Sequence, residues 1–286
     1  MHGTKSFYII DCSYHFRASF FVLPAIYSPD GKLVNAVYGF VSVLLKLLRD
    51  RHPDALAVAD DAPWPYFRHE LFRGYKAEKR RVPEECDQQR PILRRVLDAM
   101  SIPYLRAQGF EADDVIASLA PAATRYGYRV YICSKDKDLQ QLLTDDVTIL
   151  DTSSGREVTP ATLEQDKGIR PDQIPDMLAL AGDKVDSIPG IPGIGQRTAG
   201  KLLNTYGALE NILRQWQEVG GKLGANIREH RQQALLAKKL TTLRRDVPID
   251  MALDEFKSPL RDKDAVESLF RELGFDRLLK RLEGVL

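Results

Sequence analysis

The sequence predicts an α/β domain with a parallel, helix-covered sheet, followed by a smaller helical domain. Short β-branched or aromatic runs alternate with amphipathic helical stretches over roughly the first 150 residues, an alternation that is typical of parallel sheets. Beyond residue 175 the strand signal disappears, and short helical stretches punctuated by Gly and Pro follow. We therefore expect one domain at residues 1–174 and a second at 175–286.

The elements of the first domain can be assigned in chain order. Apolar or aromatic runs predict strands at 6–11, 55–59, 103–106 and 128–133, with a weaker fifth strand at 147–150. Apolar residues at helical spacing predict helices at 35–50, 88–100, 113–126 and 137–143. Strands and helices therefore alternate along this domain.

Composition and charge describe an ordinary globular protein. Of its 286 residues, 44% are hydrophobic and 28% are charged, and the net charge is +1. Overall charge therefore predicts no polyanionic partner, although acids and bases are segregated locally. The three cysteines are widely spaced and lack a metal-ligand pattern, which indicates a reducing compartment. Because the chain shows neither a signal peptide nor a run of about 18 apolar residues, we expect a cytoplasmic protein.

Carboxylates follow or nearly follow several of the predicted strands. They are Asp11, Asp61, the group Glu111, Asp113 and Asp114, and the pair Asp136 and Asp138. The carboxyl ends of parallel strands share one edge of a sheet, so these side chains should gather there. Crowded carboxylates repel one another unless divalent cations neutralise them. Each acid alone could be a helix cap or a turn residue, but together they predict a metal site.

A glycine-rich turn lies in the second domain. Glycines 190, 193 and 195 permit a tight turn that can present backbone N–H groups to a phosphate, and a helix with Lys201 follows from Thr198. The turn is not a Walker loop, because no Gly-Lys-Ser/Thr follows, and it is not a dinucleotide motif, because no strand precedes it. A plain turn between two helices is the alternative interpretation.

Basic and aromatic residues alternate between residues 67 and 81. Rings at Phe67, Phe72 and Tyr75 could stack on bases of a single strand while the neighbouring cations follow its backbone. A charged run is more often the solvated face of a helix, so this motif alone is a weak signal.

Together these motifs resemble the 5′-nuclease family, which comprises the 5′→3′ exonuclease domain of bacterial DNA polymerase I, phage 5′-exonucleases and flap endonucleases. The likeness runs over nearly the whole chain. The segments that carry it are 35–40, 67–70, 75–77, 111–115, 136–139, Gly182-Asp183 with Asp186, and 190–195.

The resemblance implies a PIN-like nuclease domain followed by a helix–three-turn–helix subdomain. It implies two or more Mg²⁺ or Mn²⁺ ions, with one cluster of ligands at Asp11, Asp61, Glu111, Asp113 and Asp114. A second cluster would be Asp136, Asp138, Asp183 and Asp186. A K⁺ ion would bind at the glycine turn.

By the same resemblance, Lys76 matches an active-site lysine in an arch helix, and Arg80 would also be catalytic. The implied DNA contacts are Arg68, Tyr75, Lys79, Arg81, Gly190, Gly193, Gly195, Arg197, Thr198 and Lys201. The expected partner is DNA with 5′ flaps, nicks or ends, or an RNA/DNA hybrid, processed by a monomer in the bacterial nucleoid. A DNA polymerase acting in trans is a further expected partner.

The chain departs from the family pattern at a few positions. Cys12 stands where glycine usually follows the first Asp, and Asp60 stands where an apolar residue usually precedes Asp61. Ser134 and Lys135 replace small residues before Asp136. Lys79 replaces the usual arginine of the arch.

Two other functions are compatible with part of the pattern. A phosphohydrolase with an aspartate nucleophile would explain Asp11, Asp136 and Asp138, but neither the glycine turn nor the basic segment. A non-catalytic binder of branched DNA would be expected to have lost acids from the metal site. The sequence therefore favours a metal-dependent nuclease.

Overall fold

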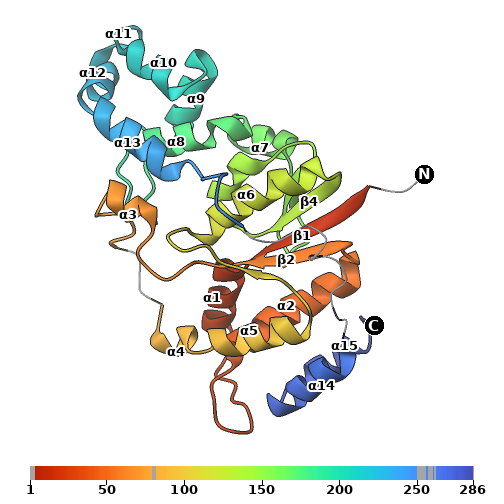
Figure 1. Ribbon diagram of the computed structural model, residues 1–286. Helices are drawn as coiled ribbons and strands as arrows, with labels where there is room; N and C mark the ends of the chain where they lie inside the picture. Colours follow the sequence, from red (N-terminus) through yellow and green to blue (C-terminus); the bar gives the residue numbers. More distant parts are fainter. Residues whose placement is uncertain (1–3, 79–81, 250–255, 257–259, 261, 286) are drawn as a thin grey trace.

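A six-stranded sheet forms the centre of the first domain (Figure 1). The computed structural model describes residues 4–78, 82–249, 256, 260 and 262–285. The strands are β1 (Lys5–Asp11), β2 (Ala55–Ala59), β3 (Tyr104–Leu105), β4 (Tyr128–Cys133), β5 (Val147–Leu150) and β6 (Glu157–Val158). The five expected strands are confirmed. The sixth is two residues long, too short for a periodic signal.

Strand order places a switch point between β1 and β4. The order is β3-β2-β1-β4-β5-β6, with β1 to β5 parallel and β6 antiparallel to β5. The strands β2 and β3 therefore extend the sheet on one side of β1, and β4, β5 and β6 extend it on the other side. In open α/β sheets, the crevice for ligands lies at the carboxyl ends of strands at such a point.

Helices cover both faces of the sheet (Figure 1). On one face lie α1 (Cys12–Val22), α2 (Asn35–Arg51) and α5 (Arg90–Ala99), and on the other lies α6 (Ala112–Arg125). Alternate residues of β1 enter two separate cores, because Phe7 and Ile9 pack on the α6 side while Tyr8 and Ile10 pack on the α2 side. The sheet is thus buried on both faces, as parallel sheets are.

The second half of the chain is helical, as expected. Its helices are α7 (Pro160–Lys167), α8 (Ile174–Ala181), α9 (Gln196–Tyr206), α10 (Leu209–Arg214), α11 (Trp216–Val219), α12 (Gly221–Glu229) and α13 (Arg231–Thr241). Short elements elsewhere are α3 (Phe67–Leu71), α4 (Glu84–Asp87), η1 (Asp138–Leu142) and η2 (Pro171–Gln173). Within the described residues, none of the helices is both long and apolar enough to cross a membrane.

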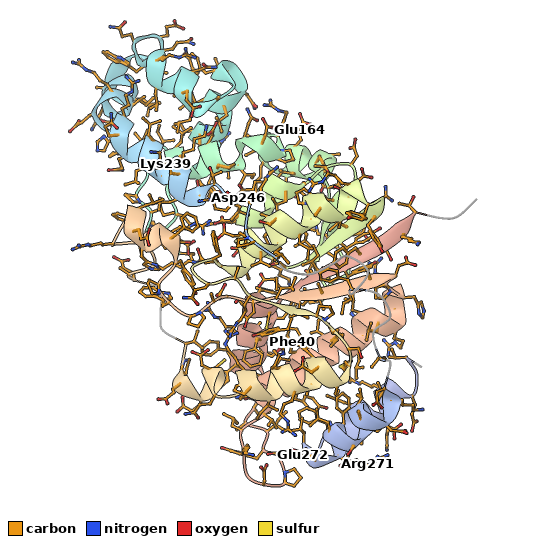
Figure 2. The ribbon with its side chains drawn as sticks, viewed as in Figure 1. Phe40, Glu164, Lys239, Asp246, Arg271 and Glu272 are labelled. Carbon is orange, nitrogen blue, oxygen red and sulfur yellow. The ribbon has the colours of Figure 1, made fainter. Side chains whose placement is uncertain are left out.

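The last two helices return to the first domain. α14 (Lys263–Glu272) and α15 (Asp276–Leu282) lie beside α5 and α2, away from the other late helices (Figure 1). Phe270 and Phe275 join the core that contains Phe40 of α2, and Glu272 pairs with Arg95 of α5 at 2.8 Å (Figure 2). A division of the chain at 174/175 remains a prediction, but the residues after it do not all lie together.

Candidate active site

Asp11 is the last residue of β1 and lies at the switch point of the sheet. Its Oδ1 accepts the backbone N–H of Tyr14 at 3.0 Å, so Asp11 caps helix α1. Its Oδ2 accepts the hydroxyl of Ser134, just beyond β4, at 2.7 Å. Burial raises the pKa of Asp11 to about 7, with a contribution from the charges of Asp61 and Asp136.

Asp61 lies just beyond β2, between two cations. Its Oδ1 accepts the backbone N–H of Ala112 at 2.9 Å, and its Oδ2 lies 3.4 Å from Arg17 Nη2. Burial alone would raise the pKa of Asp61, but the charges of Lys76 and Arg17 and two hydrogen bonds hold it below its usual value. Arg17 could not be predicted as a site residue, because the apolar spacing at 12–22 does not indicate a helix. In the helix that forms there, Arg17 lies one to two turns beyond Asp11.

Glu111 and Asp113 stand at the start of α6, on the same edge. Glu111 is the N-cap residue and is 3% exposed. Burial raises the pKa of Asp113 well above its usual range, and the charges of Asp136 and Asp11 raise it further. Asp136 is held by its own loop, where its Oδ1 accepts the backbone N–H of Asp138 at 2.9 Å. Asp136 lies close enough to Asp11 and Asp113 for its charge to raise the pKa values of both. Acids of both predicted clusters therefore lie at the same edge of the sheet.

Asp114 has different partners. Arg68 donates to its two oxygens at 2.6 and 2.8 Å, and the backbone N–H of Arg244 donates at 2.9 Å. Asp114 and Arg68 are 0% and 2% exposed. We expected Asp114 to bind metal and Arg68 to contact DNA. Their burial and mutual pairing instead support a structural role, because the donors of Arg68 face protein acceptors.

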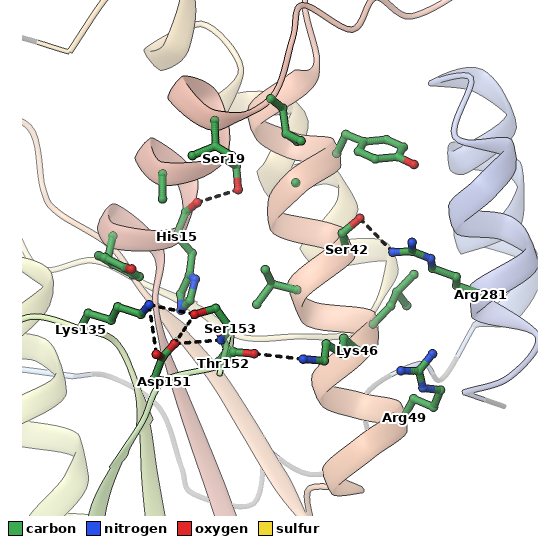
Figure 3. A pocket seen from close by; sticks show the side chains of 18 of the residues that line it. His15, Ser19, Ser42, Lys46, Arg49, Lys135, Asp151, Thr152, Ser153 and Arg281 are labelled. Atoms are coloured by element: carbon green, nitrogen blue, oxygen red, sulfur yellow. Dashed lines mark hydrogen bonds and ion pairs between the residues drawn. The ribbon is translucent and has the colours of Figure 1, made fainter. Parts of the chain in front are cut away.

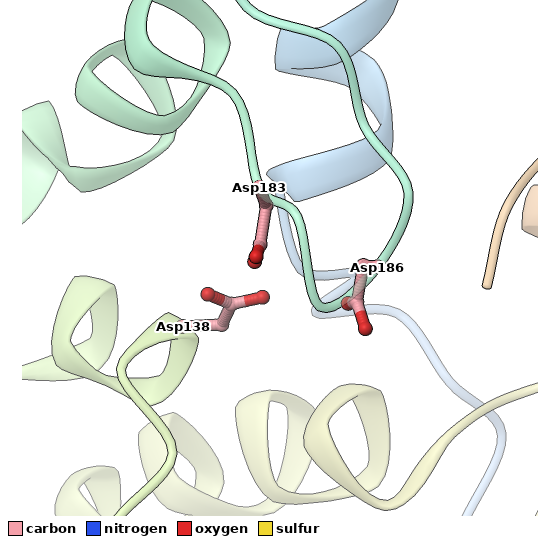
Figure 4. A group of neighbouring side chains, drawn as sticks. All are labelled: Asp138, Asp183 and Asp186. Carbon is pink, nitrogen blue, oxygen red and sulfur yellow. The ribbon is translucent and has the colours of Figure 1, made fainter. Parts of the chain in front are cut away.

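Three of the four carboxylates of the second predicted cluster lie close together (Figure 4). Ligand oxygens of Asp138, Asp183 and Asp186 all lie within 4.8 Å of one another, and each residue is buried. Burial raises the pKa of Asp138 to about 8, and neighbouring acids contribute. Its Oδ1 is buried without a hydrogen-bond partner. A hard divalent cation would supply the missing charge, so these residues fit a metal site. Lys137 partly offsets the charge, with Nζ 2.7 Å from Asp183.

Lys76 lies between the clusters. Its Nζ contacts Glu111 and lies 3.7 Å from Asp186 Oδ1. Burial lowers the pKa of Lys76, but Glu111, Tyr75 and Asp186 raise it well above its usual value, so the side chain is charged. The expected arch helix was wrong for this residue, because Lys76 lies in a turn at φ +55°. Tyr75, expected to stack on DNA, is 3% exposed, and its hydroxyl lies 2.9 Å from Glu111.

The glycines of the predicted turn differ in their surroundings. A Cβ on Gly190 would lie 2.3 Å from the carbonyl carbon of Ala181, so this glycine permits close packing against the end of α8. Gly193 has φ +85°, and its turn is braced where Asn226 donates to the carbonyl of Pro192 at 2.8 Å. Gly195 is exposed, its conformation is ordinary, and a Cβ there would face open space.

Beyond the turn, α9 presents polar residues to solvent. Arg197 and Lys201 are exposed and Thr198 is half-buried. Lys79, Arg80 and Arg81 lie outside the described residues.

A basic pocket opens next to the acidic edge (Figure 3). Its volume is about 760 Å³, and it runs from Tyr14 and Lys135 along α1 and α2 to α15. The cations that line it are Lys46, Arg49, Lys135, Arg277 and Arg281. Lys135 is neutralised by Asp151 at 3.0 Å, so this departure from the family pattern adds little net charge to the metal edge.

Two family descriptions cover most of the chain. Residues 6–168 match "5′-3′ exonuclease, N-terminal resolvase-like domain", and residues 169–264 match "5′-3′ exonuclease, C-terminal SAM fold". The chain belongs to the 5′-3′ exonuclease family. This confirms the resemblance seen in the sequence and the α/β-plus-helical fold expected from it.

Several members of the 5′-3′ exonuclease family align with almost the whole chain. It is 41% identical to DNA polymerase I of Bacillus caldotenax, over 98% of this chain and 32% of that protein. It is 35% identical to the 5′-3′ exonuclease of Aquifex aeolicus, over 98% of this chain and 96% of that protein. The chain thus spans about a third of the DNA polymerase I relatives and nearly all of the Aquifex protein.

Solved structures share the fold. T5 5′-exonuclease with bound zinc superposes with a TM-score of 0.69 at 21% identity, covering 98% of each chain. T5 D15 flap endonuclease, in a complex with DNA and metal ions, gives 0.68 at 20% identity, again covering 98% of each. The catalytic core of Rad2 with a DNA substrate gives 0.67 at 16% identity, covering 99% of this chain and 92% of that one.

Proposed function

We propose that this 5′-3′ exonuclease family member is a structure-specific, metal-dependent 5′→3′ exonuclease and 5′-flap endonuclease, acting on branched or nicked DNA and on RNA primers. The observation that carries the proposal is the convergence of carboxylates from five segments of the chain at the edge of the sheet that contains the switch point, beside a buried, charged lysine. Relatives named for 5′-3′ exonuclease and flap endonuclease activity support it.

Two groups of acids would hold divalent cations, Mg²⁺ or Mn²⁺. Asp11, Asp61, Glu111 and Asp113 would serve one site, and Asp136, Asp138, Asp183 and Asp186 the other. Bound cations would polarise the scissile phosphate and make a water molecule a better nucleophile at neutral pH. The protein itself contributes by holding these carboxylates in position before the substrate binds. Asp11 is held by Ser134 and the first turn of α1, and Asp61 by the first turn of α6.

Lys76 would act on the phosphate itself. Its ammonium pairs with Glu111 and lies near Asp186. Cations bound to these carboxylates would weaken that pairing, leaving the ammonium free to stabilise charge that develops on the phosphate oxygens. Arg80, which lies outside the described residues, would assist Lys76 in this role.

The glycine turn and the first turn of α9 would hold duplex DNA by its phosphates. Gly195 precedes the helix and is exposed, so the first N–H groups of α9 can approach a phosphate closely. Arg197, Thr198 and Lys201 would add contacts, and backbone carbonyls of the turn would bind K⁺. Recognition by phosphates depends on DNA shape more than on base sequence. A DNA polymerase, on the same chain or acting in trans, would use the product.

One experiment separates the proposed nuclease from a phosphatase and from a passive binder. The protein is incubated with a labelled 5′-flap duplex in Mg²⁺ or EDTA, and separately with a chromogenic phosphate monoester. We expect flap cleavage in Mg²⁺ only and no ester hydrolysis. Asp138→Asn should abolish cleavage but retain duplex binding, whereas the exposed Asp145→Asn should cleave normally. Cleavage that survives in Asp138→Asn at saturating Mg²⁺ would remove this residue from the site.

A further inference from the structure

Asp60 is a buried carboxylate that the proposed metal site does not use. It lies between the end of β2 and Asp61, and it is 0% exposed. A buried carboxylate is costly unless charged or hydrogen-bonding partners surround it. An apolar residue at this position would avoid that cost. The role of the Asp60 charge must therefore be sought in the groups that the carboxylate contacts.

One oxygen of Asp60 ties together the elements behind the site. Oδ2 contacts Arg90 of α5 and the hydroxyl of Tyr104 on β3, and it lies 2.9 Å from Arg106 Nη2. The guanidinium of Arg90 also lies over the ring of Phe16 on α1, 5.3 Å from its centroid. These contacts hold the Asp60 carboxylate in one place.

The other oxygen points toward the metal edge through Ser13. The Ser13 hydroxyl donates to Asp60 Oδ1 at 2.9 Å, and Ser13 Oγ in turn accepts the backbone N–H of Asp61 at 3.2 Å. A serine hydroxyl has one proton, so donation to Asp60 turns its lone pairs toward the Asp61 N–H. Ser13 stands two residues after Asp11. One hydroxyl therefore links the ends of the two strands that carry Asp11 and Asp61.

We propose that Asp60 and Ser13 are positioning residues that set the separation of Asp11 and Asp61, and thereby the affinity of the first metal site. The anchored Asp60 carboxylate orients the Ser13 hydroxyl, and the hydroxyl fixes the backbone at Asp61. Removing a partner that orients metal ligands typically lowers metal affinity by about 10- to 100-fold. The inference rests on the proposed ligation of metal by Asp11 and Asp61.

The test is Mg²⁺ binding to the DNA-free protein, measured by titration calorimetry. Ser13→Ala removes the link but leaves the ion pairs of Asp60 intact, and we expect the Kd for Mg²⁺ to rise about 10-fold or more. Ser13→Thr keeps a hydroxyl and should restore most of the affinity. Tyr104→Phe is the matched control. It removes one of the three contacts of Asp60 Oδ2 and leaves the ion pairs with Arg90 and Arg106 to hold the carboxylate, so it should lower the melting temperature without changing the Kd.

Two results would overturn the inference. One is a wild-type Kd for Mg²⁺ in folded Ser13→Ala. The other is an equal loss of affinity in Tyr104→Phe, which would mean that any damage to the network acts through stability. Asp61→Asn separates this inference from the proposed function. If Asp61→Asn binds Mg²⁺ like the wild type, the ligand assignment itself is wrong, whereas weakened binding there with an unchanged Ser13→Ala refutes only the positioning role.

Discussion

Cation binding to this protein should release protons near neutral pH. Burial raises the pKa of Asp11 to about 7 and that of Asp138 to about 8, so both carboxyl groups are partly protonated in the cation-free protein at pH 7. Cations bind the ionised form. Because both groups titrate near neutral pH, cation binding at pH 7 should release on the order of one proton.

The pH dependence has a defined sign. As the pH rises through these two pKa values, the carboxyl groups lose their protons before cations bind, so the release should fade. The apparent affinity for Mg²⁺ should therefore increase with pH and level off above about pH 9. Asp113, whose pKa is also raised, would add to the release.

The assay is calorimetric titration with Mg²⁺ in two buffers of different ionisation enthalpy. At pH 7 the heat should differ between the buffers in proportion to the protons released, and at pH 9 the difference should nearly vanish. Asp138→Asn should release fewer protons than the wild type at pH 7, while Asp145→Asn, at an exposed position, should match the wild type. Equal heats in both buffers at pH 7 would refute the reasoning.

Three further predictions concern other parts of the molecule. Lys76→Ala should lower the single-turnover cleavage rate by roughly 100-fold, with a smaller change in DNA affinity; weaker binding at an unchanged rate would make Lys76 a backbone contact. Gly195→Val should fold normally but bind flap duplex weakly with a flatter salt dependence, whereas Gly193→Val should also lose thermal stability because of its positive φ. Duplex affinity at the wild-type level in Gly195→Val would make the turn purely structural. Burial lowers the pKa of His15 to about 4, so the unfolded chain binds the extra proton as pH falls below 6.5. The free energy of unfolding of His15→Gln, measured in urea, should therefore rise relative to that of the wild type by up to ~3 kcal/mol as the pH falls from 6.5 to 4. A difference between the two proteins that does not change with pH would contradict this.

Much of the fold could be predicted because the core strands carry dense local signals. The runs at 6–11 and 55–59 are buried on both faces, so nearly every residue in them is apolar or aromatic. The run at 128–133 is buried except at Arg129, which is exposed, and Tyr131, which is half-buried. The helix at 12–22 was missed because its small and polar residues interrupt the apolar spacing. β6 was missed because its pairing with β5 depends on a long-range contact that two residues do not encode.

The acids of the site were easier to predict than the cations. An Asp directly after a buried strand has a position fixed by topology, so Asp11 and Asp61 could be placed at the edge without coordinates. Arg68 and Tyr75 gave no such indication. In a run of basic and aromatic residues, the sequence does not distinguish a side chain that faces DNA from one that folds inward onto Asp114 or Glu111. That distinction depends on how α3 packs.

The buried side chain of Arg68 has a mechanical consequence. It donates to Asp114 on α6 and also, through Nε, to the carbonyl of Leu240 on α13 at 2.8 Å. A second link runs from the backbone N–H of Arg244 to Asp114, beside the first. The helical region is therefore fastened to the first turn of α6, the helix whose start supports the metal edge. These hydrogen bonds hold the helical region that carries the glycine turn against the domain that carries the acidic edge. If the glycine turn holds duplex DNA as proposed, the protein itself sets the distance along a bound strand from the duplex to the cut.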